Sequence, residues 1–201
     1  MKQTLTAIIL TLSISGLLAW NNAPAQTQSS SANENTSINW ISIQQLSDMV
    51  QRRSWKKKKK KVLVDLYTNW CGWCKRMDAS TYKDPEIINY INEHYYAVRF
   101  DAEMRDSINF GGKMYHYVKP PGARRGTNEL AIALGNVNGR MGYPTTVFMD
   151  EDMQLLQALP GFKDSKSMLP ILVYFGEDYA KTTPWDDFLK AYPNNKHSDK
   201  E

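Results

Sequence analysis

The spacing of apolar residues along the chain changes between the helical period and the continuous apolar runs of buried strands. Ser42 and Gln45 form a capping box, and the apolar residues that follow recur at helical spacing, which predicts a helix over 43–53 after a short strand over 39–41. The run Val62 to Tyr67 is mostly apolar and rich in β-branched residues, as a strand covered on both faces should be. We therefore expect this run to be the central strand of a sheet.

Helices and strands alternate beyond this strand. Asp84 followed by Pro85 gives an N-cap and a proline at the first helical position, which predicts a helix over 85–94. A strand over 96–100 should then return beside the central strand through a right-handed crossover. The other expected elements are a helix that starts at Cys71, a β-hairpin around Gly111-Gly112, a loop over 119–126, a short helix over 129–134, antiparallel strands over 145–149 and 153–159, a helix over 165–175 and a last short helix after Pro184.

Together these elements predict an α/β domain in which helices flank a central mixed sheet. Pro170 favours a start nearer Ser167 for the helix expected over 165–175, because proline is tolerated only in the first turn of a helix.

The N-terminal segment has the composition of an export signal. Lys2 gives a basic start, residues 7–19 are largely apolar, and Ala23-Pro24-Ala25 satisfies the small-x-small rule for cleavage before Gln26. The apolar stretch is interrupted by threonine and serine and is shorter than the roughly 20 apolar residues of a membrane span. We expect residues 1–25 to be a cleavable signal peptide and the protein to be periplasmic or secreted; an uncleaved anchor is the alternative.

The rest of the chain divides into three regions. Residues 26–37 are polar and predict a flexible tether, residues 38–193 are the length of one folded domain, and residues 194–201 predict a disordered tail. The formal net charge is only +4, which is too small to argue for a nucleic-acid partner.

One charge cluster stands out, the six consecutive lysines Lys56 to Lys61. Such a run is typical of a solvated loop that enters a strand, and its mutual repulsion should keep it exposed. Attraction to an acidic partner or an anionic membrane surface is the alternative interpretation.

The only two cysteines, Cys71 and Cys74, follow the central strand at the start of a helix. Residues three apart in a first helical turn have Cα atoms about 5 Å apart, within the range that a disulfide tolerates. The unpaired N–H groups and the dipole at a helix N-terminus stabilise an anion, so the Cys71 thiol should have a lowered pKa and be the attacking thiolate. Cys74 would then be the resolving thiol.

The sequence gives less support to other roles for the two cysteines. An inert structural disulfide would close only a four-residue loop and stabilise little. A metal site needs two more ligands, and His94, His116 and His197 lack zinc-finger spacing. Haem attachment needs histidine where Lys75 stands. We therefore expect no metal and no other cofactor.

Three motifs resemble the thioredoxin family. Val62-Leu63-Val64-Asp65, followed by Trp70-Cys71-Gly72-Trp73-Cys74-Lys75, is similar to the thioredoxin active-site stretch, with Trp73 as the changed residue. Gly142-Tyr143-Pro144-Thr145 stands before a strand, where this family keeps a cis-proline, and Gly161 follows the antiparallel strand. The resemblance covers about residues 38–180 and implies a thioredoxin fold with a redox-active disulfide.

A fourth motif resembles a particular group within the thioredoxin family. Thr81 to Ile87, with the extra helix that it starts, is similar to exported thioredoxin-like proteins related to the periplasmic C-terminal domain of bacterial thiol:disulfide interchange proteins. An insertion over 104–128 and an additional C-terminal helix lie outside the family pattern. The insertion is a candidate for specificity, and a surface elaboration is the alternative.

The resemblance implies a role for each matching residue. Cys71 corresponds to the family nucleophile, Cys74 to the resolving cysteine, and Asp65 to the buried acid that helps Cys74 lose its proton. Arg99 stands near the family lysine that pairs with this acid. The set expected to bind substrate is Trp70, Trp73, Tyr143 and Pro144, with the Tyr143 backbone beside a cis Pro144.

These residues predict an exported thiol-disulfide oxidoreductase that reduces or exchanges protein disulfides. Trp73 supplies no charge to the site, which favours a reductase over a strong oxidant. A reductase in an oxidising compartment needs an electron donor, either a membrane protein or a soluble one. The alternative is a non-catalytic thioredoxin-like binding module or chaperone that uses Trp70, Trp73, Tyr143 and the 104–128 insertion.

Overall fold

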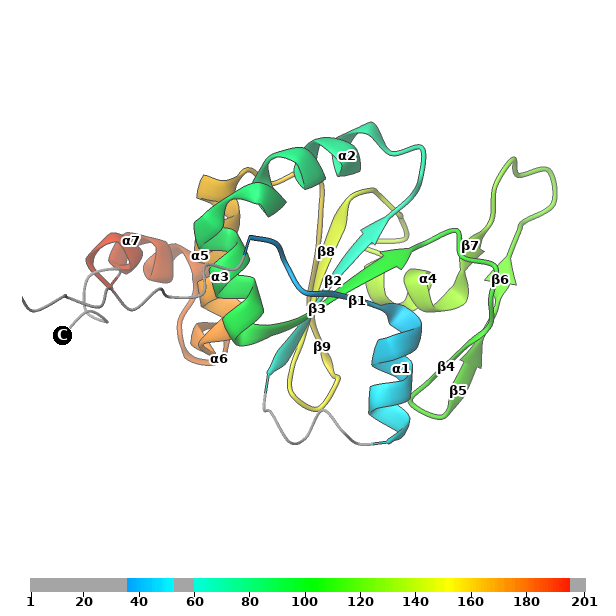
Figure 1. The fold of residues 1–201 in the computed structure, drawn as a ribbon, viewed down its shortest axis with the longest axis horizontal. Coiled ribbons are helices and arrows are strands. Elements are labelled where there is room, and N and C mark those ends of the chain that lie inside the picture. Colours follow the sequence, from blue (N-terminus) through cyan, green and yellow to red (C-terminus); the bar gives the residue numbers. More distant parts are fainter. Residues whose placement is uncertain (1–35, 53–59, 196–201) are drawn as a thin grey trace, which may run out of the picture. The chain divides into compact units, whose positions relative to one another are not determined.

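The computed structural model describes residues 36–52 and 60–195, which contain a five-stranded mixed sheet (Figure 1). The strand order is β1-β3-β2-β8-β9, and β2 pairs in parallel with β3 but antiparallel with β8. The sheet strands are β1 (Trp40–Ser42), β2 (Lys61–Tyr67), β3 (Tyr95–Asp101), β8 (Thr145–Met149) and β9 (Leu155–Pro160). The expected α/β architecture with a central mixed sheet is confirmed, with β2 at its centre.

Helices cover both faces of this sheet (Figure 1). They are α1 (Ile43–Gln51), α2 (Gly72–Ala79), α3 (Pro85–His94), α4 (Glu129–Gly135), α5 (Ser165–Gly176), α6 (Tyr179–Thr182) and α7 (Trp185–Asn195), with a 3-10 turn, η2 (Thr81–Lys83), between α2 and α3. Side chains of α1 and α4 pack on one face, and side chains of α2, α3 and α5 pack on the other.

The alternation of β2 decides which face each of its residues joins. Val62, Val64 and Leu66 belong to the core beneath α1 and α4, whereas Leu63 belongs to the core beneath α2, α3 and α5. Asp65 is two residues from Leu63 and therefore points to the same face as α2. This alternation brings a carboxylate under the helix that carries the cysteines.

Local capping explains where several helices begin. The Ser42–Gln45 capping box is present at α1, and the Asp84 carboxylate accepts the Glu86 N–H at the start of α3. The expected start of α5 near Ser167 is wrong. The Asp164 carboxylate accepts the Ser167 N–H at 2.8 Å and caps a helix that begins at Ser165, so Pro170 lies inside it.

The 104–128 insertion contains two small hairpins. β4 (Ile108–Phe110) and β5 (Lys113–Tyr115) pair antiparallel around Gly111-Gly112, as expected. A second pair, β6 (Tyr117–Val118) and β7 (Thr127–Asn128), closes the loop over 119–126 and has no counterpart among the expected elements. The loop is thereby held at both ends.

The expectation that the whole lysine run stays exposed is wrong at its last member. Lys61 begins β2 and is 3% exposed, and its Nζ lies 2.6 Å from Glu151 Oε1 and 2.8 Å from Asp178 Oδ1. Burial acts to lower the pKa of Lys61, but the two carboxylates outweigh it and the pKa is raised. Entry into the central strand buries the side chain, and the two acids make that burial tolerable.

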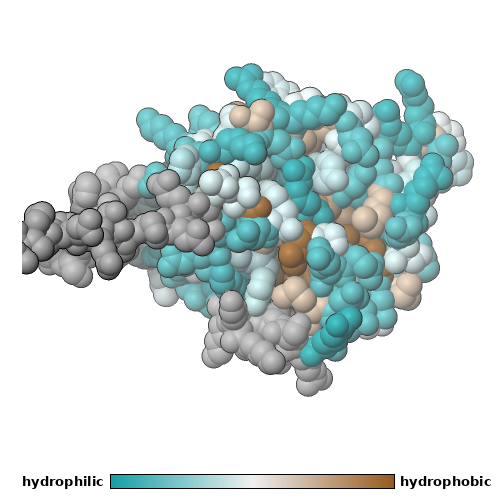
Figure 2. All heavy atoms as spheres, in the orientation of Figure 1, coloured by the Kyte–Doolittle hydropathy of each residue, from teal (hydrophilic) through white to brown (hydrophobic). Residues whose placement is uncertain are grey.

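Several expectations fall on residues that the structure leaves undescribed. They are the signal peptide, the tether up to residue 35, Lys56 to Lys59 and residues 196–201. Helix α7 runs to Asn195, two residues beyond the end expected for the domain. Among the described residues, no helix has both the length and the apolar character needed to cross a membrane. The viewed face is mostly hydrophilic, with small hydrophobic patches (Figure 2).

Replacement of the buried lysine tests its structural role. We expect Lys61→Met to lower the free energy of unfolding by about 1–3 kcal/mol, because it leaves two carboxylates facing each other without their cation. Chemical denaturation at pH 7 measures the change, and Lys83→Met, at an exposed lysine, should change stability by less than about 0.5 kcal/mol. Equal effects of the two substitutions would contradict this role for Lys61.

Candidate active site

The two cysteines form a disulfide at the first turn of α2. Their Cα atoms are 5.3 Å apart, and Cys71 is the N-cap residue of the helix. The Cys74 N–H donates to Cys71 Sγ at 3.0 Å, so the helix terminus directs a backbone donor at this sulfur. Both cysteines are almost fully buried, at 4% and 3% exposed. The structure thus shows the oxidised form of the pair.

Asp65 lies in β2 on the face that α2 covers and is 2% exposed. Its cross-strand neighbours are Arg99 on β3 and Thr146 on β8. Arg99 Nε is 3.4 Å from Asp65 Oδ2, so the sequence expectation that Arg99 stands near this acid agrees with the geometry.

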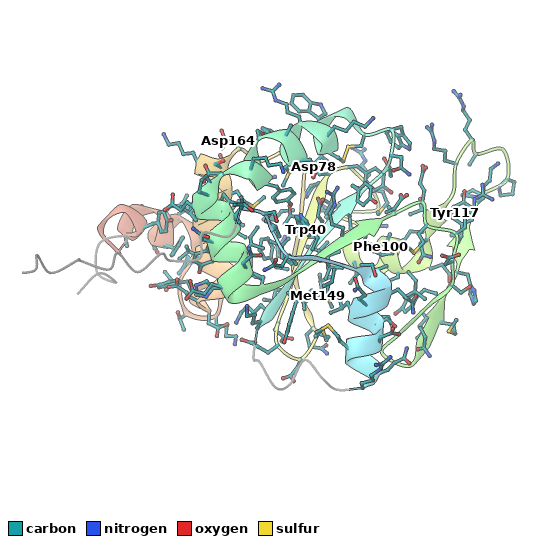
Figure 3. All side chains as sticks on the ribbon, viewed as in Figure 1. Trp40, Asp78, Phe100, Tyr117, Met149 and Asp164 are labelled. Atoms are coloured by element: carbon teal, nitrogen blue, oxygen red, sulfur yellow. A yellow bond between two sulfur atoms is a disulfide. The ribbon has the colours of Figure 1, made fainter. Side chains whose placement is uncertain are left out.

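Arg99 links the buried acid to a second carboxylate nearer the surface. Its Nη1 and Nη2 donate to the two carboxylate oxygens of Asp78 at 2.8 and 3.1 Å, and its guanidinium stacks on Tyr67 at 4.6 Å. Asp78 is carried by α2, and Figure 3 labels it there. The bidentate pair fixes the guanidinium, so only its Nε faces Asp65.

Burial raises the pKa of the Asp65 carboxyl to about 7, against the opposing effect of the Arg99 charge. The nearby charge of Asp78 raises the same pKa further. Asp65 Oδ1 and the hydroxyls of Tyr82 and Thr146 are all buried, and a hydrogen bond from Tyr82 acts to lower the pKa of Asp65. The carboxyl therefore titrates near neutral pH, where it can accept or return a proton.

Trp70 projects beside Cys71 with 50% of its surface exposed. Its Nε1 donates to Glu103 Oε1 at 2.9 Å, its ring meets Tyr143 edge-on at 6.0 Å, and Arg125 lies 4.9 Å over its ring centre. The structure thus brings Trp70 and Tyr143 together, as two of the expected substrate-binding residues.

Trp73 lies beside Cys74 with 55% of its surface exposed and packs against a different partner, Phe162, at 5.6 Å. Arg76 lies 5.3 Å over the Trp73 ring centre. The Tyr143–Pro144 peptide bond is cis, and the Pro144 carbonyl accepts the Gly161 N–H at 2.8 Å.

Sequence reasoning did not assign roles to several residues of this region. Asp78 and Arg76 could have been found from helical spacing, because both follow Cys74 on α2 within five residues. The contact of Glu103 with Trp70 depends on the turn after β3, and that of Arg125 depends on the path of the insertion; the sequence holds no local signal for either. Within the described ranges, no cluster of three or more histidine, cysteine or acidic side chains could hold a metal ion.

A five-stranded sheet with a Cys-x-x-Cys disulfide at a helix N-terminus and a buried acid on the preceding strand defines a thioredoxin-like thiol-disulfide oxidoreductase. A family model described as thioredoxin-like domain matches residues 50–176, and the chain belongs to this family.

Solved structures with a similar fold have low sequence identity to this chain. A thioredoxin-fold protein from Helicobacter pylori is 22% identical, with 68% of this chain and 81% of that chain covered and a TM-score of 0.48. A putative disulphide-isomerase from Bacteroides thetaiotaomicron is 20% identical, with coverages of 75% and 97% and a TM-score of 0.47. The DsbD C-terminal domain from Neisseria meningitidis is 18% identical, with coverages of 67% and 99% and a TM-score of 0.42. The search of curated proteins found no match.

The raised pKa of Asp65 predicts how stability depends on pH. The folded protein holds this proton up to about pH 7, whereas an unfolded aspartate releases it near pH 3.8, so the Asp65 contribution to stability falls as pH rises between these values. We expect oxidised Asp65→Asn to gain stability over the parent by roughly 2–4 kcal/mol between pH 4 and pH 8. Denaturation at several pH values measures the difference.

The control for this series is Asp106→Asn, which changes an exposed carboxylate of the insertion. Its stability relative to the parent should stay nearly constant across the same pH range. If the Asp65→Asn difference were also flat, Asp65 would not carry a raised pKa.

Proposed function

We propose that this protein is exported and reduces or exchanges protein disulfides through the Cys71–Cys74 pair. The observation that carries the proposal is the Cys71–Cys74 disulfide at the N-terminus of α2, on the sheet face that also holds buried Asp65. Export rests on the signal-like composition of residues 1–25, with cleavage after Ala25 and a periplasmic or secreted destination. Residues 26–37 would then act as a tether for the domain over 38–193.

In the reducing direction, the catalytic cycle begins from the dithiol. The Cys71 thiolate attacks one sulfur of a substrate disulfide, forms a mixed disulfide and releases the other substrate sulfur as a thiolate. The Cys74 thiolate then attacks Cys71 Sγ and releases the second substrate sulfur. Two electrons pass from the pair to the substrate, and the protein is left as the disulfide.

Asp65 serves the second attack by accepting the Cys74 proton. A carboxyl with a pKa of about 7 can take a proton from a thiol and return it without a large energy change. Burial is the main cause of this raised pKa, and the charges of Arg99 and Asp78 modify it in opposite directions, so these two residues act as positioning residues.

The residues at the start of α2 support the reducing direction of the proposal. The charge-neutral donors at the helix terminus face Cys71, and Trp73 between the cysteines adds no charged donor. The lack of a charged donor between the two cysteines supports a reduced form that is less favoured than in a strong oxidant, and therefore a reducing role for the pair. A dithiol donor, membrane-bound or soluble, must return the two electrons after each cycle.

Substrate would bind across the exposed faces of Trp70 and Trp73. Tyr143 packs on Trp70, and Pro144 directly precedes β8. An extended substrate segment would then lie between the two indoles. The partners of this protein are then protein disulfides and an electron donor.

A resolving-cysteine variant tests the exchange chemistry. We expect Cys74→Ser to accumulate mixed disulfides with substrate proteins, because the second attack can no longer release Cys71. Non-reducing electrophoresis with mass spectrometry detects the adducts. The matched control Cys71→Ser should capture none covalently, and if it keeps all partner binding and cellular effect, the protein is a binding module or chaperone instead.

The reduction potential tests the direction separately. Equilibration of the purified protein with glutathione or dithiothreitol buffers should give a potential closer to the reducing thioredoxins, about −270 mV, than to strong oxidants, about −120 mV. A value near the oxidising end would reverse the proposed direction and leave the exchange chemistry in place.

A further inference from the structure

We propose that two arginine–tryptophan stacks beside the disulfide select substrates whose cysteine is flanked by acidic residues. This inference rests on the proposed exchange function and adds the chemical class of the substrate. One stack is Arg125 over Trp70, at 4.9 Å, and the other is Arg76 over Trp73, at 5.3 Å. Because Trp70 precedes Cys71 and Trp73 precedes Cys74, a cation lies over the indole next to each sulfur.

Both stacks are open to a partner. The two indoles are 50% and 55% exposed, and the Arg125 side chain is 54% exposed. Arg76 also lies over Phe162, at 5.5 Å, which extends the apolar surface on the Trp73 side. Each stack therefore offers an apolar face for aliphatic or aromatic side chains and a guanidinium for a carboxylate.

The insertion adds positive charge on the Trp70 side. The insertion over 104–128 carries five basic residues, Arg105, Lys113, Lys119, Arg124 and Arg125, and a single acid, Asp106. Hydrophilic side chains project where β6 and β7 lie, at the right of Figure 2, and Figure 3 labels Tyr117 on β6 there. The insertion that approaches Trp70 is thus predominantly basic.

The loop that presents Arg125 is held in place at its base. The Gly126 N–H donates to the Tyr117 hydroxyl at 2.8 Å, and a Cβ at Gly126 would lie 2.3 Å from the Val118 carbonyl oxygen. β6 and β7 close the same base. Arg125 is therefore delivered to Trp70 by a closed loop with little room for rearrangement.

Glu103 holds the Arg125 side chain in position but leaves its guanidinium exposed to solvent. Glu103 Oε1 accepts Trp70 Nε1 at 2.9 Å and lies 3.6 Å from Arg125 Nε, and its side chain is 23% exposed against 54% for Arg125. The neighbouring acid Asp101 accepts from Asn69 Nδ2 at 3.0 Å and from the Glu103 N–H at 3.0 Å. Asp101 and Glu103 thus have partners within the protein, while the Arg125 side chain remains about half exposed.

The occupant that fits is an extended protein segment with its cysteine at the disulfide and aspartate or glutamate on either side. An extended chain advances about 3.3 Å per residue, so acids one to three residues from the cysteine would come within reach of the stacks. A guanidinium can bind a carboxylate with two parallel hydrogen bonds, which favours acids over amides of the same shape.

The test uses the full-length protein in its reduced form and three disulfide-linked peptides that are identical except for Glu, Gln or Lys flanking the cysteine. Single-turnover rate constants for the peptides give the selectivity. We expect the Glu peptide to react about tenfold faster than the Lys peptide in 20 mM salt and less than threefold faster in 500 mM salt.

Variants assign this selectivity to the stacks. Arg125→Gln and Arg76→Gln should each reduce the Glu-to-Lys rate ratio about threefold, and the double variant should bring it close to one. Arg125→Lys, which keeps the charge but loses the planar fork, should fall between parent and Arg125→Gln. Lys83→Gln, at an exposed lysine outside the insertion and the two stacks, is the matched control and should leave the ratio nearly unchanged.

The possible failures are distinguishable. Equal rates for the three peptides, with normal reduction of a small neutral disulfide, overturn the inference and leave the proposed function standing. A ratio that persists in the double variant overturns the assignment to these arginines. Loss of reduction of the small neutral disulfide by the parent protein overturns the proposed function and the inference with it.

Discussion

The placement of Asp65 in the central strand is the constraint around which the rest of the site is arranged. Its neighbours in β2 are apolar and fully buried, so the carboxyl sits where an ion is costly. Arg99 comes from the adjacent strand to oppose that cost, and Asp78 comes from α2 to hold Arg99. Residues of β2, β3 and α2 thus meet around Asp65, whose pKa is about 7. The two cysteines lie at the start of the same helix, α2.

This arrangement separates the proton chemistry from the substrate surface. The buried acid, its arginine and Asp78 are placed by β2, β3 and α2, which belong to the packed core. Trp70 lies in the turn before α2, Trp73 and Arg76 lie on α2, and Arg125 comes from the 104–128 insertion. Substitutions in the insertion can therefore alter partner choice without moving the groups that handle protons and electrons.

Much of the fold could be predicted because its signals are local. The Ser42–Gln45 capping box, the Asp84-Pro85 start and the apolar run of β2 each act within a few residues, and the corresponding elements match. The start of α5 was predicted too late because the cap is Asp164, whose carboxylate outweighs the unfavourable Pro170. The Cys71, Cys74 and Asp65 positions also follow from motif spacing.

The remainder depends on contacts between distant parts of the chain. Nothing near Arg125 indicates that it will lie over Trp70, 55 residues earlier, because that contact needs the whole path of the insertion. The burial of Lys61 likewise requires Glu151 and Asp178, both about 90 residues or more away. In each case the contacts could not be predicted because the partners are remote in sequence.

The ion pairs of Lys61 connect the central strand to the turn after β8 and to the C-terminal helices. Lys61 stands at the start of β2, whereas the disulfide follows the end of that strand, so the two lie toward opposite ends of the same strand. Its partners are Glu151, in the turn between β8 and β9, and Asp178, which caps α6. The C-terminal helices are therefore connected to the sheet by ion pairs at the end of β2 remote from the sulfurs, so this anchoring is separate from the redox site.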